Sequence, residues 1–140
     1  MGWDYEAFTK ATKADIREHG RPTSGWMAGG PFMVLTTTGA KTGQPREAVV
    51  TFTRDGDAYV VCGSKSGATT DPFWYRNLVA NPTVTVEAEG RKFEARADVA
   101  QGADRDALWA HHVAERPEFA DYPAKTAGRV MPMIRLTPVE

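Results

Sequence analysis

The chain has 140 residues, of which 41% are hydrophobic and 25% charged, as is typical of one globular domain with a substantial core. Its formal net charge is −1, from 17 Lys and Arg against 18 Asp and Glu. This balance excludes a protein that is drawn as a whole to nucleic acid or to an anionic membrane, so any affinity for anions must be local.

Cysteine use and hydropathy narrow the class further. Cys62 is the single cysteine and lies in an apolar run, which predicts a small buried thiol and no internal disulfide. The chain has no apolar run of about 18 residues, and its first residues lack the basic start and apolar segment of an ordinary signal peptide. We therefore expect a cytoplasmic protein.

The first predicted element is a helix over Asp4–His19, where apolar residues recur every three or four positions between charged ones. Asp4 can cap its start, and Gly20 ends it. We assign residues 1–22 to this helix and a linker, and residues 23–140 to the main domain. Weak contact of the helix with the inner face of the cell membrane is an open alternative.

Strands follow in close order, with Asp55-Gly56 as a hairpin turn between the second and the third. The predicted strands are Phe32–Thr38, Arg46–Arg54, Asp57–Ser64, Thr83–Ala88, Lys92–Val99 and Val130–Leu136. Six strands with few helices argue against a doubly wound parallel sheet. They favour a mainly β fold with short helices, in which an antiparallel sheet closes or half-closes on itself.

Two further helices are predicted. Asp71 as N-cap and Pro72 at the first helical position begin one that runs over Phe73–Ala80. The other covers Ala103–Glu115, with Leu108, Val113 and either Trp109 or His112 pointing inward.

The connection between the first two strands, Gly39–Arg46, is longer and more polar than a hairpin requires. It carries two glycines, which let backbone N–H groups approach a ligand, and the cations Lys41 and Arg46. From the residues alone, a phosphate site and a set of solvated loop cations are equally good interpretations. The Lys-Thr pair is not a Walker loop, because the required earlier glycine and the following helix are missing.

Other kinds of chemistry find little support. His111 and His112 are adjacent and diverge on a helix, and His19 is remote, so no metal site is expected. There is no Gly-x-Ser-x-Gly motif and no evident pair of catalytic carboxylates. The consecutive rings of Phe73, Trp74 and Tyr75 cannot all face one core. A site with no nucleophile or metal of its own suggests that a cofactor carries the chemistry.

Two motifs at a fixed distance resemble the deazaflavin-dependent nitroreductase family: Thr36–Arg46, and Ser64-Lys65 followed by Trp74–Pro82. The similarity extends over about residues 32 to 138. It implies a split β-barrel similar to that of FMN-binding proteins. It also implies coenzyme F420, a deazaflavin with a phosphodiester and an oligoglutamate tail, and hydride transfer from its reduced form to quinones, unsaturated lactones or enones, and nitroaromatics.

The resemblance also implies site residues. Three segments would hold F420, with the turn after the first strand on its phosphate: Val34, Leu35, Thr36, Ala40, Lys41, Thr42, Gly43, Gln44, Pro45, Arg46; Val61, Cys62, Gly63, Ser64, Lys65; and Phe73, Trp74, Tyr75, Arg76, Asn77. Lys10, Lys13 or Arg17 would reach the anionic tail.

The catalytic candidates are Ser64 and Tyr122, as proton or hydrogen-bond donors, and the substrate candidates are Phe119 and Arg116. In family members that reduce nitroimidazole prodrugs, this region has the pattern Tyr-x-x-Tyr-x-x-Tyr. The three corresponding residues here are Arg116, Phe119 and Tyr122, so only the last is a tyrosine.

Two rival functions stay open. One is an oxidoreductase that uses FMN, because split barrels also bind FMN. The other is a non-catalytic carrier of the deazaflavin or of a lipid. The expected partner is a small-molecule electron acceptor, with no nucleic acid and no metal, and the chain is expected to be a monomer or a homodimer.

Overall fold

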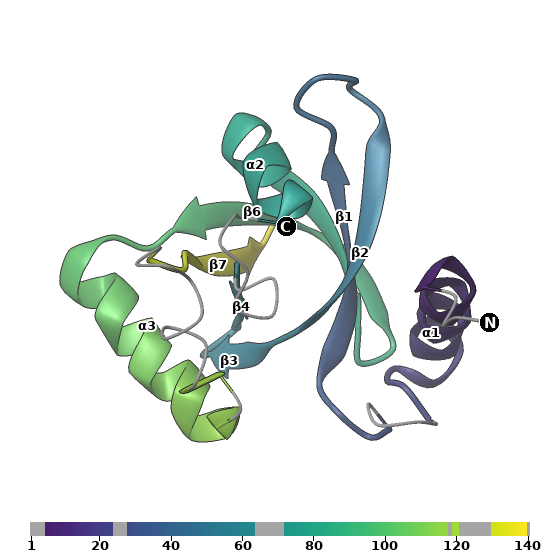
Figure 1. Cartoon of the computed structure of the whole chain (residues 1–140), viewed down its shortest axis with the longest axis horizontal. Coiled ribbons are helices and arrows are strands. Elements are labelled where there is room, and N and C mark those ends of the chain that lie inside the picture. Colours follow the sequence, from purple (N-terminus) through teal and green to yellow (C-terminus); the bar gives the residue numbers. More distant parts are fainter. Residues whose placement is uncertain (1–4, 24–27, 64–71, 118, 121–129, 140) are drawn as a thin grey trace.

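The structure is a computed structural model that describes residues 5–23, 28–63, 72–117, 119–120 and 130–139. Within these ranges the chain forms seven strands and three helices (Figure 1). Their order is α1 (Tyr5–His19), β1 (Phe32–Thr38), β2 (Pro45–Thr51), β3 (Thr53–Asp55), β4 (Ala58–Cys62), α2 (Phe73–Ala80), β5 (Thr83–Ala88), β6 (Arg91–Val99), α3 (Gly102–Glu115) and β7 (Met133–Pro138).

The described strands form one sheet in the order β2-β1-β5-β6-β7-β4-β3, and neighbouring strands are antiparallel. β2 and β3 stand at opposite ends of this order, yet only Phe52 separates them in the chain. The sheet must therefore curl until its two ends meet at that residue, as Figure 1 shows. The prediction of a mainly β, split β-barrel fold is confirmed.

The single predicted strand Arg46–Arg54 is wrong, because it is two strands. The backbone N–H of Phe52 donates to the carbonyl of Pro31, beside β1, while Thr53 already pairs with Val60 of β4. One alternating stretch thus serves both ends of the curled sheet. Sequence alternation alone does not reveal such a change of partner.

Successive residues of a strand point to opposite faces, and here the faces belong to different cores. Met33 and Leu35 of β1 point into the barrel, where Trp74 and Leu78 of α2 cover the core. The interior cluster consists of buried residues from six strands, from α2 and from Phe52 between β2 and β3: Met33, Leu35, Ala48, Phe52, Tyr59, Val61, Trp74, Leu78, Val84, Val86, Ala88, Ala95, Ala97, Ile134 and Leu136.

The other two helices pack outside the barrel. Ile16 of α1 packs with Phe32, Val34 and Val49, on the face of β1 and β2 opposite to α2. α3 covers a third cluster made of Val60, Cys62, Ala100, Leu108, Phe119, Met131 and Met133. In Figure 1, α1 and α2 accordingly lie on opposite sides of the β1–β2 hairpin.

On α3, the prediction that Leu108 points inward is confirmed, and His112 rather than Trp109 is the fully buried ring. Its Nδ1 lies 3.0 Å from the hydroxyl of Thr53, and its ring meets Phe119 edge-on at 4.5 Å. Cys62 is buried, as predicted.

Several predicted element ends move. β4 ends at Cys62 rather than Ser64, and β7 begins at Met133 rather than Val130. Pro72 is the N-cap of α2 in an extended conformation, not its first helical residue, and the predicted cap Asp71 lies outside the described residues. No helix in the described ranges is long and apolar enough to cross a membrane.

Candidate functional site

The turn between β1 and β2, residues 39–44, closes at the free end of the hairpin. The N–H of Gly39 donates to the carbonyl of Gln44 at 2.8 Å, and the N–H of Gly43 donates to the carbonyl of Gly39 at 2.9 Å. The Thr42 hydroxyl accepts from the N–H of Gln44 at 3.2 Å. These bonds make the turn a defined structure rather than a loose loop.

Both glycines are needed, for different reasons. Gly43 has φ +69, in the left-handed region that favours glycine. At Gly39 a side chain would collide inside the turn, because an added Cβ would lie 2.5 Å from the Thr42 hydroxyl oxygen and 3.3 Å from the Gln44 carbonyl oxygen. The turn therefore depends on one glycine for its conformation and on the other for its compactness.

The hydrogen bonds also limit what the turn can offer to an anion. The N–H groups of Gly39, Ala40, Gly43 and Gln44 all donate within the protein. Between them, the N–H groups of Lys41 and Thr42 make no hydrogen bond to the described part of the chain. An anion at this turn would thus meet those N–H groups together with exposed Lys41 and Arg46 side chains.

Asn77 of α2 holds the first stem of the turn. Its side-chain oxygen accepts from the N–H of Ala40 at 2.9 Å, and its side-chain nitrogen donates to the Thr37 hydroxyl at 3.1 Å. The Thr37 hydroxyl in turn lies 3.5 Å from the carbonyl of Arg46, on the second stem. Asn77 is only 8% exposed and its amide is engaged on both sides, so it links α2 to the first stem of the turn.

α2 also supplies an exposed ring beside the turn. The Arg46 guanidinium lies 5.0 Å from the centre of the Phe73 ring, a cation–π contact. Phe73 and Arg76 are exposed, Tyr75 is partly buried and Trp74 belongs to the interior cluster. The three consecutive rings therefore face different ways, as the helix geometry predicts.

Gly63 follows β4 directly and lies close to Pro72, the residue before α2. Its N–H donates to the carbonyl of Pro132 at 2.9 Å. An added Cβ would lie 2.6 Å from Pro132 Cγ and 3.6 Å from Pro72 Cδ. Only glycine allows this approach, so two of the predicted cofactor segments, at Gly63 and at Phe73, meet through Pro72.

Four of the predicted cofactor residues on β1 and β4 have buried side chains. Val34 faces α1, Leu35 and Val61 face the barrel interior, and Cys62 faces α3. These side chains cannot line one common surface, and a ligand would meet the polypeptide backbone there.

Of the substrate and catalytic candidates, the structure describes Phe119 and Arg116. Phe119 is buried beneath α3 against His112, and Arg116 directly follows that helix. Ser64, Lys65 and Tyr122 lie outside the described residues.

Charged residues on the α1 side form a network that the sequence analysis missed. Lys13 Nζ donates to Glu47 Oε1 at 2.9 Å, and Arg17 bonds both Glu47 and Glu87. The hydrogen bonds that Glu47 accepts from Lys13 and Arg17 lower the pKa of Glu47. The hydrogen bonds from Arg17 to Glu87 raise the pKa of Arg17. The sequence did contain a signal for this network. In the alternating strand TVTVEA, Glu87 stands at a position that the repeat otherwise fills with threonine.

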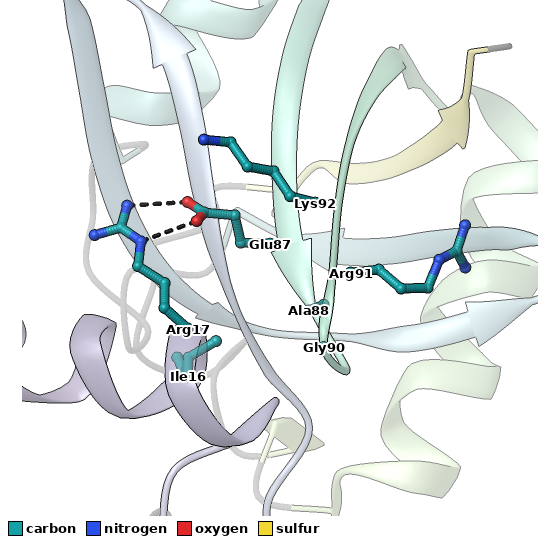
Figure 2. A pocket seen from close by; sticks show the side chains of 7 residues that line it. All are labelled: Ile16, Arg17, Glu87, Ala88, Gly90, Arg91 and Lys92. Carbon is teal, nitrogen blue, oxygen red and sulfur yellow. Dashed lines mark hydrogen bonds and ion pairs between the residues drawn. The ribbon is translucent and has the colours of Figure 1, made fainter.

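A hollow of about 110 Å³ lies beside this network (Figure 2). It is lined by Ile16, Arg17, Glu87, Ala88, Gly90, Arg91 and Lys92. Figure 2 shows Arg17 turned toward Glu87 and Arg91 turned away. Of the residues predicted to contact the cofactor, the hollow contains Arg17, a candidate for the anionic tail, and Arg17 is already paired with Glu87.

Comparisons with known proteins place the chain among reductases. Residues 8–138 match the model of the family described as F420H(2)-dependent quinone reductase. The chain is 40% identical over 112 residues to an F420H(2)-dependent quinone reductase of Mycobacterium tuberculosis, an alignment that covers 76% of this chain and 73% of the relative.

Solved structures agree. An F420-H2 dependent reductase (FDR-A) superimposes with a TM-score of 0.69 at 33% identity, covering 76% of this chain and 93% of that one. A structure described as a domain-swapped dimer superimposes with a TM-score of 0.72 at 29% identity, covering 91% of this chain and 94% of that one.

Proposed function

The chain belongs to the F420H(2)-dependent quinone reductase family, and on that basis we propose that it reduces a quinone-class acceptor with hydride from reduced F420. The family match over residues 8–138 carries this proposal. The resemblance seen in the sequence is thereby confirmed, and F420 rather than FMN is the cofactor of the family. Lactones, enones and nitroaromatics are the further acceptors to be tested.

The residues present fit an anionic cofactor. On our proposal Lys41 and Arg46 hold its phosphodiester, with the N–H groups of Lys41 and Thr42 completing the contact. The exposed ring of Phe73, already under the Arg46 guanidinium, is placed to bound the ligand on the α2 side. This local positive charge on a chain of net charge −1 suits a ligand whose charge sits at one end.

When bound, reduced F420 supplies the hydride, and the rest of the work falls to the protein. The chain must hold the acceptor within about 3–3.5 Å of the donor carbon and keep water from the gap. The acceptor oxygen also needs a proton or a hydrogen bond as its negative charge develops. Ser64 and Tyr122 stay our candidates for this role, and Arg116 and Phe119 for shaping the acceptor site.

Turnover tests the function directly. We expect the purified protein to oxidise reduced F420 with menadione as the acceptor. The reaction is monitored by the return of the absorbance of the oxidised deazaflavin. Binding of F420 without turnover of any quinone, enone or nitro acceptor would instead support the carrier. Tyr122→Phe and Ser64→Ala should each slow turnover, and unchanged rates on several acceptors would remove both residues from the mechanism.

We also propose that the chain forms a homodimer. The 29%-identical solved relative that is described as a domain-swapped dimer supports this assignment. Light scattering of the eluted protein tests it, and a mass near 15.3 kDa would contradict it. A cytoplasmic location, with or without contact of α1 with the membrane's inner face, stays a prediction that cell fractionation can test.

A further inference from the structure

We propose that α1 positions the cofactor turn, through a charged bridge in which Arg17 and Lys13 fix Glu47 on the strand that carries Arg46. This inference rests on the proposed function of the turn. On this proposal the N-terminal helix serves the F420 site by positioning a strand, and not by contact with the cofactor's tail or with a membrane.

The bridge crosses three strands. Glu47 of β2 is paired with Thr36 of β1, and Glu87 of β5 is paired with Val34 of the same strand. The two carboxylates therefore flank β1 on the α1 face. Arg17 reaches across, with Nε and Nη2 each 2.9 Å from an oxygen of Glu87 and with Nη2 also bonded to Glu47 (Figure 2 shows the Glu87 half).

β2 needs such a tie because it is the last strand at its end of the sheet order. In that order β2 has β1 as its one neighbour, and the first three residues of β2 are exposed. Glu87, by contrast, belongs to the interior strand β5 and is only 8% exposed. Arg17 thus links the free end of the outermost strand to the body of the sheet.

The link lies next to the residue that matters for binding. Glu47 follows Arg46 directly, and neighbours on a strand point to opposite faces. Arg46 therefore points toward Phe73 of α2, while Glu47 is held by α1. Asn77 secures the first stem of the turn, and the α1 bridge secures the second.

The bridge also argues against direct contact of Lys13 and Arg17 with the anionic tail. Lys13 and Arg17 are already paired with carboxylates of this chain. A direct contact and a positioning role predict opposite results when Glu47 is neutralised. Glu47→Gln frees Lys13, releases Arg17 from one of its two carboxylates and removes a negative charge near the turn, which would tighten binding if these cations held the tail. If α1 positions Arg46, the same change weakens binding.

We would measure the dissociation constant of F420 by quenching of tryptophan fluorescence in the full chain. We expect Glu47→Gln to raise it about fivefold, with kcat at saturating cofactor within twofold of the wild type. Arg17→Lys conserves charge but cannot reach both carboxylates with one ammonium group, and should raise it about two- to threefold. Asp98→Asn is the matched control, because it neutralises an exposed ion-paired carboxylate on β6 and should leave binding unchanged.

Amide hydrogen exchange of the ligand-free protein gives a second readout. Exchange over residues 40–47 should be faster in Glu47→Gln and not in Asp98→Asn. An unchanged or lower dissociation constant in Glu47→Gln overturns the proposal, as does an equal loss of affinity in the Asp98 control. If Arg17→Lys does not fold, Lys13→Met replaces it, since it removes one tie to Glu47 and leaves Arg17 in place. A wild-type protein that does not bind F420 would refute the proposed function instead.

Discussion

Replacing Asn77 by alanine removes the link between α2 and the turn between β1 and β2. Two hydrogen bonds are lost, at 2.9 Å from Ala40 and at 3.1 Å to Thr37, and the Thr37 hydroxyl is left in a site that is 1% exposed. The bond to exposed Ala40 contributes about 1 kcal/mol net, and loss of the bond to the buried Thr37 hydroxyl costs about 1–3 kcal/mol. We therefore expect Asn77→Ala to lower the free energy of unfolding by about 2–4 kcal/mol.

That loss is smaller than the ~5–15 kcal/mol stability of a typical domain, so the variant should still fold and allow measurement. Urea unfolding of the ligand-free protein, followed by circular dichroism, gives the free energy, and F420 titration gives the accompanying loss of affinity. Asn81→Ala is the matched control on the same helix end, because its side chain makes one long bond of 3.4 Å to the Thr38 carbonyl. It should cost less than about 1 kcal/mol. Equal costs for the two variants would refute the view that Asn77 holds the turn.

Two further predictions concern α1. Gly20→Ala should lower the free energy of unfolding by about 1 kcal/mol more than Gly56→Ala does. Both residues have positive φ, but of the two only Gly20 has a backbone atom, the nitrogen of Gly90, 3.0 Å from an added Cβ. Equal losses in urea unfolding would contradict this. The pKa of Glu47 is lowered in the folded protein, so at acid pH the unfolded chain binds more protons than the folded one. The ion pairs of Glu47 therefore stabilise the fold above about pH 4.5, and this stabilisation is lost as the pH falls. It is at most ~1 kcal/mol, because the pair is partly exposed. The wild type should lose more stability between about pH 5 and 3 than Glu47→Gln does, and parallel curves would show that the ion pairs contribute nothing.

Local patterns predicted most of the elements. β1 and β5 have their predicted bounds, and α2 ends at Ala80 as predicted, because alternation, turn glycines and helix stops are local features of neighbouring residues. The division at Phe52 was not predictable in this way. It depends on which strands lie on either side of that residue in space, and a single alternating run looks the same in both cases.

The site divides similarly. The exposed cations and the turn glycines could be predicted from composition, and the cofactor from the family resemblance. The roles of Asn77 and Glu47 depend on partners 37 and 34 positions away in the chain, which no local pattern identifies. Val34 and Cys62 have packed side chains, so that the predicted contact of these residues with the cofactor would be made by their backbone.

The most direct test of the account is the dissociation constant of F420 for Arg46→Glu. The variant reverses the charge that we place on the cofactor's phosphodiester, and we expect the dissociation constant to rise at least about tenfold, or ~1.4 kcal/mol. Arg96→Glu makes the same charge change at an exposed arginine of β6 and should stay within twofold of the wild type. If Arg46→Glu binds F420 as tightly as Arg96→Glu, the turn between β1 and β2 is not the phosphate site.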